Sequence, residues 1–355
     1  MVGLIPRRSP ARTLVTGGAG FIGGEVIRSL LTDGGEVTVY DDLSNAEPDW
    51  LEPWSDVPRL TFVRGDATDS ADILAAMAGH DRVVHLAAGT DIAGGFGHPE
   101  TDFSSGVMAT ETVCAAMLEL DVRELWYASS GVVYGRPRRI PTAESDGPLL
   151  PESHYAAAKL AGEAIISGFA HLYGWRALVF RFGNTVGPRS NHGVVHDFVV
   201  KLLRDPRHLE ILGDGAQAKP YVAVTDLVAG MRHAADVPSD GSVTVLNIGP
   251  EGTLSVRDVA QIVIEALDIP QHAVELAFND SALIGGGGWP GDTAHVEFDT
   301  AAMRFLGWLP SMTAREAVRA AAIGVATRYR MSGRPLQTAG ERRAASRSTV
   351  GSRSG

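Results

Sequence analysis

Tyr155 and Lys159 stand four residues apart in an alanine-rich run of the sequence. This composition predicts a helix, in which residues i and i+4 share one face. A lysine ammonium beside a phenol favours the phenolate, because an opposite charge lowers the pKa of an acid. A tyrosine made acidic in this way can exchange a proton with a substrate alcohol near neutral pH. Both residues are common on ordinary helices, so the pair indicates acid–base chemistry only together with a second motif.

That second motif is a glycine-rich turn near the N-terminus, in which Gly17, Gly20 and Gly23 separate an apolar strand from a helix. Glycines at this spacing permit a tight turn and let the backbone approach a pyrophosphate, which the helix N-terminus attracts. Asp41 ends the next strand, where a carboxylate binds a ribose diol and repels a 2′-phosphate. We therefore expect an NAD site rather than an NADP site. The alternative is a glycine-rich turn beside a solvated aspartate.

The elements that must position these residues alternate between strands and helices. We expect strands at 13–16, 36–40, 60–64, 82–87, 124–129 and 176–181, with helices at 72–78, 106–120 and 153–172 and another that follows the glycine turn. Such alternation is typical of βαβ units with right-handed crossovers. It predicts an α/β fold with a doubly wound parallel sheet of the Rossmann type and a smaller C-terminal α/β domain.

The domain boundaries follow from where this regularity stops. We expect an NAD-binding domain at 1–183, to which 216–240 returns as a strand and a helix. A substrate-binding domain would then comprise 184–215 and 241–330. The remainder, 331–355, is rich in Gly, Arg, Ser and Ala and is expected to be a disordered tail.

Composition excludes several classes of function. The chain has 355 residues, 45% of them hydrophobic, which is enough for a large buried core. Its net charge of −11 argues against a nucleic-acid partner. Cys114 is the only cysteine, so no internal disulfide can form, which fits a reducing, cytoplasmic location. The sequence contains neither an apolar run of about 18 residues nor a signal-peptide pattern, so we expect no membrane association.

Three motifs together resemble the extended short-chain dehydrogenase/reductase family. They are the glycine turn, the run Ser129–Gly135 and the Tyr155–Lys159 pair. The resemblance is to its nucleotide-sugar epimerases and dehydratases, in particular the UDP-glucose 4-epimerase-like branch, and it covers about residues 12–325. It implies NAD as cofactor and a UDP-sugar as substrate. It also implies a homodimer formed through the helices at 106–120 and 153–172.

The resemblance further assigns site residues by their positions in the motifs. Tyr155 would be the base, Lys159 its partner, and Ser130 the residue that binds and orients the substrate hydroxyl. Asn184 and Lys219 would contact the nucleotide diphosphate of the sugar. The expected cofactor-binding residues are Gly17, Gly20, Phe21, Ile22, Gly23, Asp41, Asp42, Asp66, Ala67, Leu86, Ala87, Tyr155 and Lys159.

The residues after Ser130 favour one reaction of this branch. Its 4,6-dehydratases carry an acidic pair there and its sugar-acid decarboxylases a glutamate, whereas Gly131 and Val132 cannot transfer a proton. The resemblance then implies an NAD-dependent 4-epimerase, which oxidises C4 to a 4-keto sugar and returns the hydride. A dehydratase or decarboxylase that uses another acid, for which Asp91 is a candidate, stays open. So does an NAD-sensing regulator without catalysis.

Two departures from the family pattern bear on the substrate. Lys219 precedes Pro220 where the family commonly has Arg-Asp, and lysine lacks the bidentate fork of arginine. Trp289 stands where many members have an arginine. His192 and His196 have the helical spacing of a metal-binding pair, but no acidic third ligand follows at a recognisable spacing, so we expect no metal.

Overall fold

The computed structural model describes residues 11–47, 49, 52–54, 56–89, 97–238, 241–279, 291–333 and 335–342. Asp91 and Trp289 therefore lie outside the described residues. Within the described part, the chain divides into two compact units. Unit 1 comprises the residues up to Val133, Ser153–Arg181 and Ala235–Leu246, and unit 2 comprises Tyr134–Glu152, Phe182–Ala234 and the residues from Asn247 onward.

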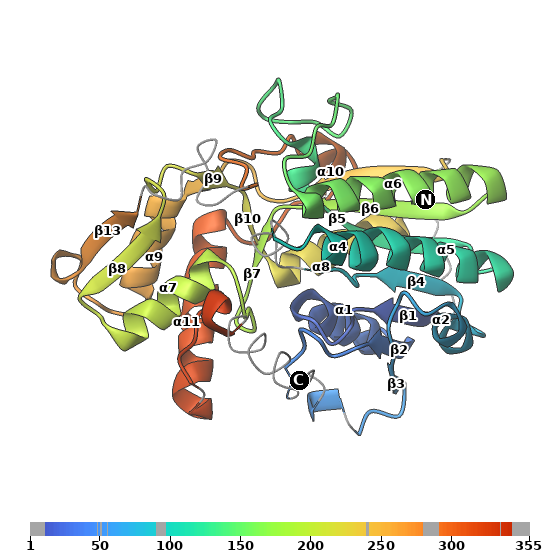
Figure 1. Cartoon of the computed structure of the whole chain (residues 1–355), viewed down its shortest axis with the longest axis horizontal. Coiled ribbons are helices and arrows are strands. Elements are labelled where there is room, and N and C mark those ends of the chain that lie inside the picture. Colours follow the sequence, from blue (N-terminus) through green and yellow to red (C-terminus); the bar gives the residue numbers. More distant parts are fainter. Residues whose placement is uncertain are drawn as a thin grey trace, which may run out of the picture. The chain divides into compact units, whose positions relative to one another are not determined.

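Unit 1 is built on a seven-stranded parallel sheet (Figure 1). Its strand order is β11-β6-β5-β4-β1-β2-β3, the doubly wound order with one strand added at an edge. The strands are β1 (Arg12–Thr16), β2 (Glu36–Asp41), β3 (Leu60–Arg64), β4 (Arg82–His85), β5 (Glu124–Ser130), β6 (Arg176–Phe182) and β11 (Val243–Ile248). This confirms the predicted fold class.

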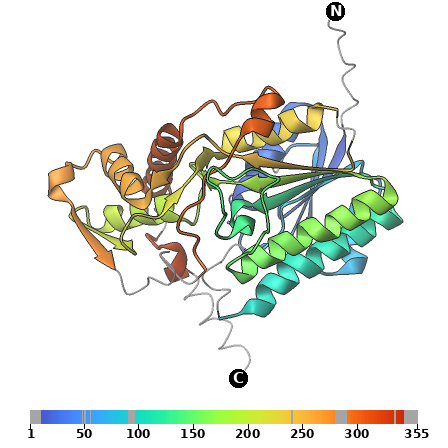
Figure 2. The same cartoon turned by 90° about the horizontal axis from the view of Figure 1, so that it is seen from above.

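Helices cover both faces of this sheet. Figure 2 shows α5 and α6 side by side on one face, with α1 on the other. Leu14, Val83 and Leu125 in the strands are fully buried against Val113 and Ile166 of the helices. The helical segments of this part are α1 (Phe21–Thr32), η2 (Glu52–Trp54), α2 (Ser70–Met77), α4 (Pro99–Asp102), the π-helical η3 (Phe103–Met108), α5 (Ala109–Glu119), η4 (Gly131–Tyr134) and α6 (His154–Tyr173).

The ends of α6 are set by two local signals in the sequence. Ser153 caps its N-terminus by accepting a hydrogen bond from the N–H of Ala156 at 3.1 Å. Gly174 ends the helix with φ at +70°, a left-handed conformation that glycine adopts without steric cost. These signals place Tyr155 in the first turn of the helix and Lys159 one turn later.

Unit 2 consists of short strand pairs packed with helices around a core of its own. Leu209, Ile211, Val259 and Val318 are buried in it completely. The strand pairs are β7 (Asn184–Val186) with β10 (Tyr221–Ala223), β9 (Ala218–Lys219) with β12 (Leu254–Ser255), and β8 (His208–Leu212) with β13 (Glu275–Asn279). The helices of this part are α7 (Val194–Arg204), α8 (Val224–Asp236), α9 (Val256–Ala266), η5 (Gln271–Ala273), α10 (Ala301–Phe305) and α11 (Ala314–Ser332).

One strand assignment from the sequence is wrong. The sequence predicts that the segment near Tyr221 returns to the main sheet, but as β10 it pairs with β7 in a separate two-stranded sheet. The main sheet is extended instead by β11, a strand that the sequence pattern does not indicate. Both segments are short apolar runs, and periodicity alone does not specify which sheet such a run joins.

The chain beyond residue 330 is partly folded, although the sequence predicts a disordered tail there. Helix α11 extends to Ser332. Glu341 forms two hydrogen bonds with the guanidinium of Arg204, at 2.8 and 2.6 Å, and the N–H of Ala339 donates to Asp197 at 3.0 Å. The segment 335–342 is thus held in unit 2 mainly by polar contacts, which a hydrophobic pattern does not reveal.

Candidate active site

The carboxyl end of the sheet in unit 1 brings most of the predicted residues to one edge. Thr16 at the end of β1 is in register with Tyr40 of β2 and with His85 of β4, and His85 is in register with Tyr127 of β5. The glycine turn, Asp41, the Leu86–Ala87 pair and Ser130 follow these positions in their strands. Ligands of doubly wound sheets bind at this edge.

The glycine turn leaves no room for side chains. Gly17 has φ at +67°, and a Cβ there would lie 2.6 Å from the backbone nitrogen of Ala87. A Cβ on Gly23 would lie 2.4 Å from the carbonyl oxygen of Gly18, so α1 starts in direct contact with the turn. Gly20 is the N-cap of α1, and Phe21 and Ile22 begin its first turn, where backbone N–H groups lack partners within the helix. This is the cradle that a dinucleotide pyrophosphate needs.

Asp41 is fixed beside this turn. Its carboxylate accepts one hydrogen bond from the N–H of Ala19 at 3.0 Å and another from the N–H of Leu43 at 2.8 Å. The side chain is 9% exposed, and burial raises its pKa above the ordinary value. Each oxygen has one protein donor and can accept another hydrogen bond, as a ribose diol would require.

The other adenosine-side residues lie near the ends of β2 and β3. Asp42 is exposed and accepts a hydrogen bond from the N–H of Ser44 at 2.8 Å. Asp66 is also exposed and accepts from the N–H and the hydroxyl of Thr68, while Ala67 is buried. Their roles in binding the adenosine stay predictions.

Tyr155, Lys159 and Ser130 lie together in unit 1. The hydroxyl of Ser130 is near enough to lower the pKa of Tyr155, and the Nζ of Lys159 lies 5.8 Å from the centre of the Tyr155 ring. The same Nζ donates to the carbonyl of Ala128 at 2.7 Å and lies 5.1 Å from the centre of the Tyr127 ring. A backbone carbonyl of β5 therefore fixes the side chain of Lys159, which belongs to α6.

The protein's own groups do not make Tyr155 acidic, contrary to the expectation from the lysine spacing. Burial, followed by the negative charge of Asp102, raises the pKa of Tyr155 to about 12, and the hydrogen bond from Ser130 lowers it. Burial also lowers the pKa of Lys159 to about 8, although Glu163 acts in the opposite direction. Desolvation is the largest influence on the pKa of both groups.

A buried hydrogen-bond network around His85 lies next to Lys159. His85 is fully buried between the hydroxyls of Thr16 and Thr110, at 2.7 and 3.1 Å, and stacks on Tyr127. Burial, reinforced by the charge of Lys159, lowers the pKa of His85 to about 3, so its imidazole is neutral. A neutral ring next to Lys159 adds no positive charge to the site.

A second network joins α6 to β5 and β6. Arg181 donates to the carboxylate of Glu163 at 3.0 and 2.7 Å, and the hydroxyl of Ser129 donates to the same carboxylate. Glu163 follows Lys159 by one helical turn, so this anchor lies on the face of α6 that carries the pair. The ion pair is almost completely buried.

The two predicted substrate residues belong to unit 2 and lie near one another there. The N–H of Asn184 donates to the carbonyl of Pro220 at 2.8 Å, which brings it next to Lys219. Lys219 is 8% exposed, and its Nζ lies 2.9 Å from the carboxylate of Asp292 and also donates to the carbonyl of Thr293. The ammonium charge is therefore already compensated by a buried acid.

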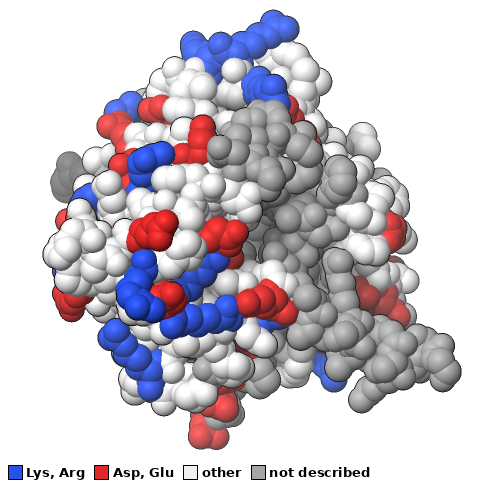
Figure 3. Space-filling model, turned by 60° about the vertical axis from the view of Figure 1, so that its left-hand side comes forward, with Lys and Arg blue, Asp and Glu red and all other residues white. Residues whose placement is uncertain are grey.

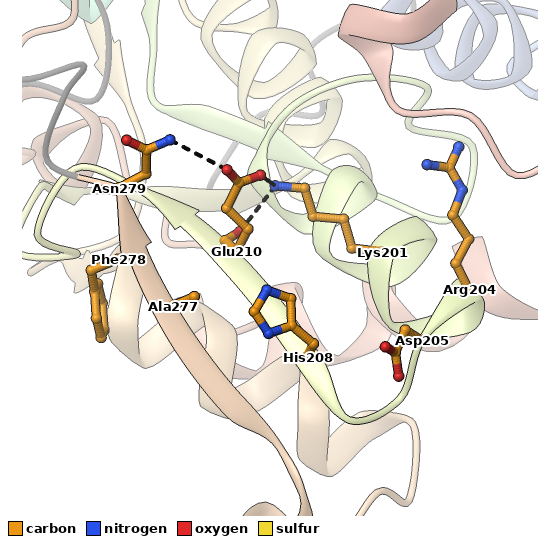
Figure 4. A pocket seen from close by; sticks show the side chains of 8 residues that line it. All are labelled: Lys201, Arg204, Asp205, His208, Glu210, Ala277, Phe278 and Asn279. Atoms are coloured by element: carbon orange, nitrogen blue, oxygen red, sulfur yellow. Dashed lines mark hydrogen bonds and ion pairs between the residues drawn. The ribbon is translucent and has the colours of Figure 1, made fainter.

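The predicted residues do not line the pocket shown in Figure 4. That pocket lies in unit 2 between α7 and the β8–β13 pair, and Glu210 at its wall binds Lys201 and Asn279 (Figure 4). Its lining residues are Lys201, Arg204, Asp205, His208, Glu210, Ala277, Phe278 and Asn279. Acidic and basic side chains are interspersed on the face shown in Figure 3, without a continuous basic area on the described part of that face.

His192 and His196 do not converge on a common point. His196 is buried and contacts Asp197 and the hydroxyl of Tyr329, whereas His192 is exposed and contacts Asn191. Across the described ranges, no group of three or more His, Cys, Asp or Glu side chains could hold a metal ion. No helix in the same part of the chain is long and apolar enough to cross a membrane.

Sequence reasoning missed one acid close to the base. Asp102 ends α4, is 4% exposed and acts electrostatically on Tyr155. Nothing in the run Pro99–Phe103 marks this aspartate as buried, because Glu100 in the same helix is exposed. Only packing distinguishes the two acids.

The sequence of the chain is similar to those of known proteins. The model of the NAD dependent epimerase/dehydratase family matches residues 13–249. The chain belongs to this family. Its cofactor is NAD, and the glycine turn with Asp41 beside it fits the pyrophosphate and ribose of that group. The predicted family and cofactor are confirmed.

Individual relatives include enzymes of two kinds. The chain is 33% identical over 315 residues to a UDP-glucose 4-epimerase of Mycolicibacterium smegmatis, covering 86% of this chain and 96% of the relative. It is also 33% identical over 267 residues to a dTDP-glucose 4,6-dehydratase of Streptomyces griseus, covering 74% and 80%. The crystal structure of the Thermus thermophilus UDP-glucose 4-epimerase in complex with NAD superposes with a TM-score of 0.77, at 28% identity, covering 90% and 99%. The chain is thus an enzyme of the NAD-dependent epimerase/dehydratase family.

Proposed function

We propose that this enzyme is a nucleotide-sugar 4-epimerase, with a UDP-hexose as its substrate. The proposal rests on two observations together. Ser130, Tyr155 and Lys159 lie close to one another, and the two residues that follow Ser130 in the sequence are Gly131 and Val132. Neither residue can donate or accept a proton in an elimination. The epimerase relatives from Mycolicibacterium smegmatis and Thermus thermophilus support the choice.

In this proposal side chains of unit 1 carry out the proton transfer. Tyr155 takes the proton of the C4 hydroxyl, and Ser130, which lies near Tyr155, orients that hydroxyl. NAD⁺, which the glycine turn and Asp41 would hold, would supply the redox chemistry, a reversible hydride transfer at C4 of the sugar. Lys159 is held by Ala128 and contributes positive charge close to the phenol. Asn184 and Lys219 contact the diphosphate.

A 4,6-dehydratase is the second candidate, because the relative from Streptomyces griseus is as similar in identity. It would require an acid outside the position after Ser130. We propose the epimerase first because the acidic pair of the dehydratases is replaced by Gly131 and Val132.

Incubation with UDP-glucose, UDP-galactose, their N-acetyl and uronic-acid forms and dTDP-glucose, followed by mass spectrometry and sugar identification, tests the proposal. An epimerase yields a new sugar nucleotide of unchanged mass. A product lighter by one water molecule identifies a dehydratase, and loss of carbon dioxide identifies a decarboxylase. NAD binding without turnover of any sugar nucleotide would instead support an NAD-sensing regulator.

We also propose that the chain forms a homodimer through α5 and α6. These helices lie side by side on one face of the sheet (Figures 1 and 2). They and the preceding η3 carry large apolar side chains in contact with solvent, namely Phe103, Met108, Leu118, Leu172 and Tyr173.

A further inference from the structure

Glu163 is a buried acid of α6 whose carboxylate joins three elements of unit 1. Its Oε1 accepts hydrogen bonds from Nε of Arg181 at 3.0 Å and from the hydroxyl of Ser129, and its Oε2 accepts from the Arg181 guanidinium at 2.7 Å. Arg181 belongs to β6 and Ser129 to β5, and they are 4% and 2% exposed. A buried ion pair is by itself weak evidence for stability, so this one calls for another explanation.

The position of Glu163 on α6 supplies that explanation. Tyr155, Lys159 and Glu163 follow one another at intervals of four residues, so they share one face of the helix. Along this face, the Nζ of Lys159 donates to the carbonyl of Ala128 at 2.7 Å, and the next residue of β5, Ser129, donates to Glu163. Two successive residues of the strand are therefore bound to two successive turns of the helix.

The contact with Ser129 also constrains Ser130, the next residue of the strand. Consecutive Cα atoms are about 3.8 Å apart, so fixing Ser129 limits where the Ser130 hydroxyl can lie. That hydroxyl lies near Tyr155. The two N–H groups of Arg181 bind the carboxylate as a fork, which fixes the orientation of Glu163 itself.

The charge of Glu163 acts in the direction that the proposed mechanism needs. Burial lowers the pKa of Lys159 to about 8, whereas the negative charge of Glu163 raises it and so favours the ammonium. The other titratable groups beside Lys159 do not oppose this effect, because His85 is neutral and burial raises the pKa of the Tyr127 phenol.

We propose that Glu163 is a positioning residue of the reaction, which holds Ser130 of β5 in place against the helix face that carries the base. It acts through the hydroxyl of Ser129 and is itself oriented by Arg181. Both of its oxygens accept hydrogen bonds from the protein, so it exchanges no proton with the substrate. This inference rests on the proposed role of Tyr155 as the base.

Ser129→Ala tests the positioning with little disturbance of the fold. It removes the hydroxyl and leaves the ion pair between Glu163 and Arg181 in place. We expect kcat for the sugar nucleotide to fall about tenfold, because small displacements of reacting groups are costly. KM and the affinity for NAD should stay unchanged. Ser167→Ala, which removes a hydroxyl near His171 further along the same helix, is the control and should keep the wild-type kcat. A wild-type kcat in Ser129→Ala would overturn the proposal.

A second measurement needs no substrate. The chain contains three lysines, namely Lys159, Lys201 and Lys219, so protein labelled with ¹³C at the lysine ε-carbon gives few NMR signals. Lys159→Met assigns the signal of Lys159, for which we expect a wild-type midpoint of about 8. Glu163→Gln should lower this midpoint by about one pH unit, because it removes a nearby opposite charge. Glu119→Gln, which changes an exposed acid of α5, should leave it unchanged.

Equal Lys159 midpoints in the wild type and in folded Glu163→Gln would also overturn the proposal. If Glu163→Gln does not fold, a wild-type midpoint below neutral pH would do so, because Lys159 would then be uncharged despite Glu163. This titration decides the role of Glu163 even if no sugar nucleotide is turned over, so its failure is distinct from a failure of the proposed function.

Discussion

At the scale of single residues, Tyr155 is the group on which the proposed chemistry depends. The buried phenol has a pKa of about 12, so it needs further positive charge to act as a base near neutral pH. The nicotinium of bound NAD⁺ would provide such a charge. The sequence predicts that Tyr155 and Lys159 share a helix face, but it does not predict this pKa, because the pKa depends on burial and on Asp102.

Replacing Tyr155 with Phe removes the proton-transfer group and little else. We expect the variant to retain NAD and to lose about 10²- to 10⁴-fold in turnover, the usual contribution of a general base. The NAD content of the purified protein and the rate of sugar-nucleotide conversion measure the two effects separately. Substantial residual turnover would show that another group takes the proton.

At the scale of elements, the turn between β1 and α1 is the feature that the sequence specifies best. The strand, the glycines, the helix and Asp41 all occupy their predicted places, because each is encoded locally. The β7–β10 pair and the partly folded C-terminal segment were missed because their partners lie far away in the sequence. Segments of three residues carry too little pattern to predict such pairing.

Gly17→Ala tests this turn. The added methyl group would clash with the backbone of Ala87, and φ at +67° disfavours any side chain. We expect loss of NAD binding by calorimetric titration and a lower melting temperature. Gly24→Ala is the matched control: it lies inside α1 with open space around its Cβ, so it should bind NAD normally and be as stable as the wild type or more so. Equal NAD affinity in both variants would contradict the proposed cradle.

The buried ion pair between Glu163 of α6 and Arg181 of β6 allows a second test at this scale. Arg181→Met leaves Glu163 buried without its ion-pair partner, so we expect the free energy of unfolding to fall by about 3–5 kcal/mol. Arg123→Met breaks an exposed ion pair with Asp121 and should cost about 1 kcal/mol or less. Urea denaturation measures both. A loss no larger in Arg181→Met than in Arg123→Met would show that the buried pair does not support α6.

At the scale of the whole molecule, the exposed apolar residues of η3 and α6 predict association. Met108→Glu places a charge on the proposed contact surface, and we expect light scattering to show a dimer for the wild type and a monomer for this variant. Met331→Glu is the control, because Met331 is 83% exposed on α11, outside the proposed surface. A monomeric wild-type protein would contradict the proposed dimer.

The family and the cofactor could be predicted from the sequence because their motifs are short and specific. The reaction depends on which proton-transfer groups surround Tyr155. The sequence shows only that two positions, Gly131 and Val132, do not carry an acid. Asp102 lies near Tyr155 through tertiary packing alone. Its presence makes a measurement of the reaction itself the decisive one.

That measurement is the fate of deuterium in UDP-glucose labelled at C4. As a 4-epimerase, the enzyme should convert it to UDP-galactose of unchanged mass, with the deuterium returned to C4. A product lighter by one water molecule, with the deuterium moved to C6, would contradict the epimerase and identify a 4,6-dehydratase.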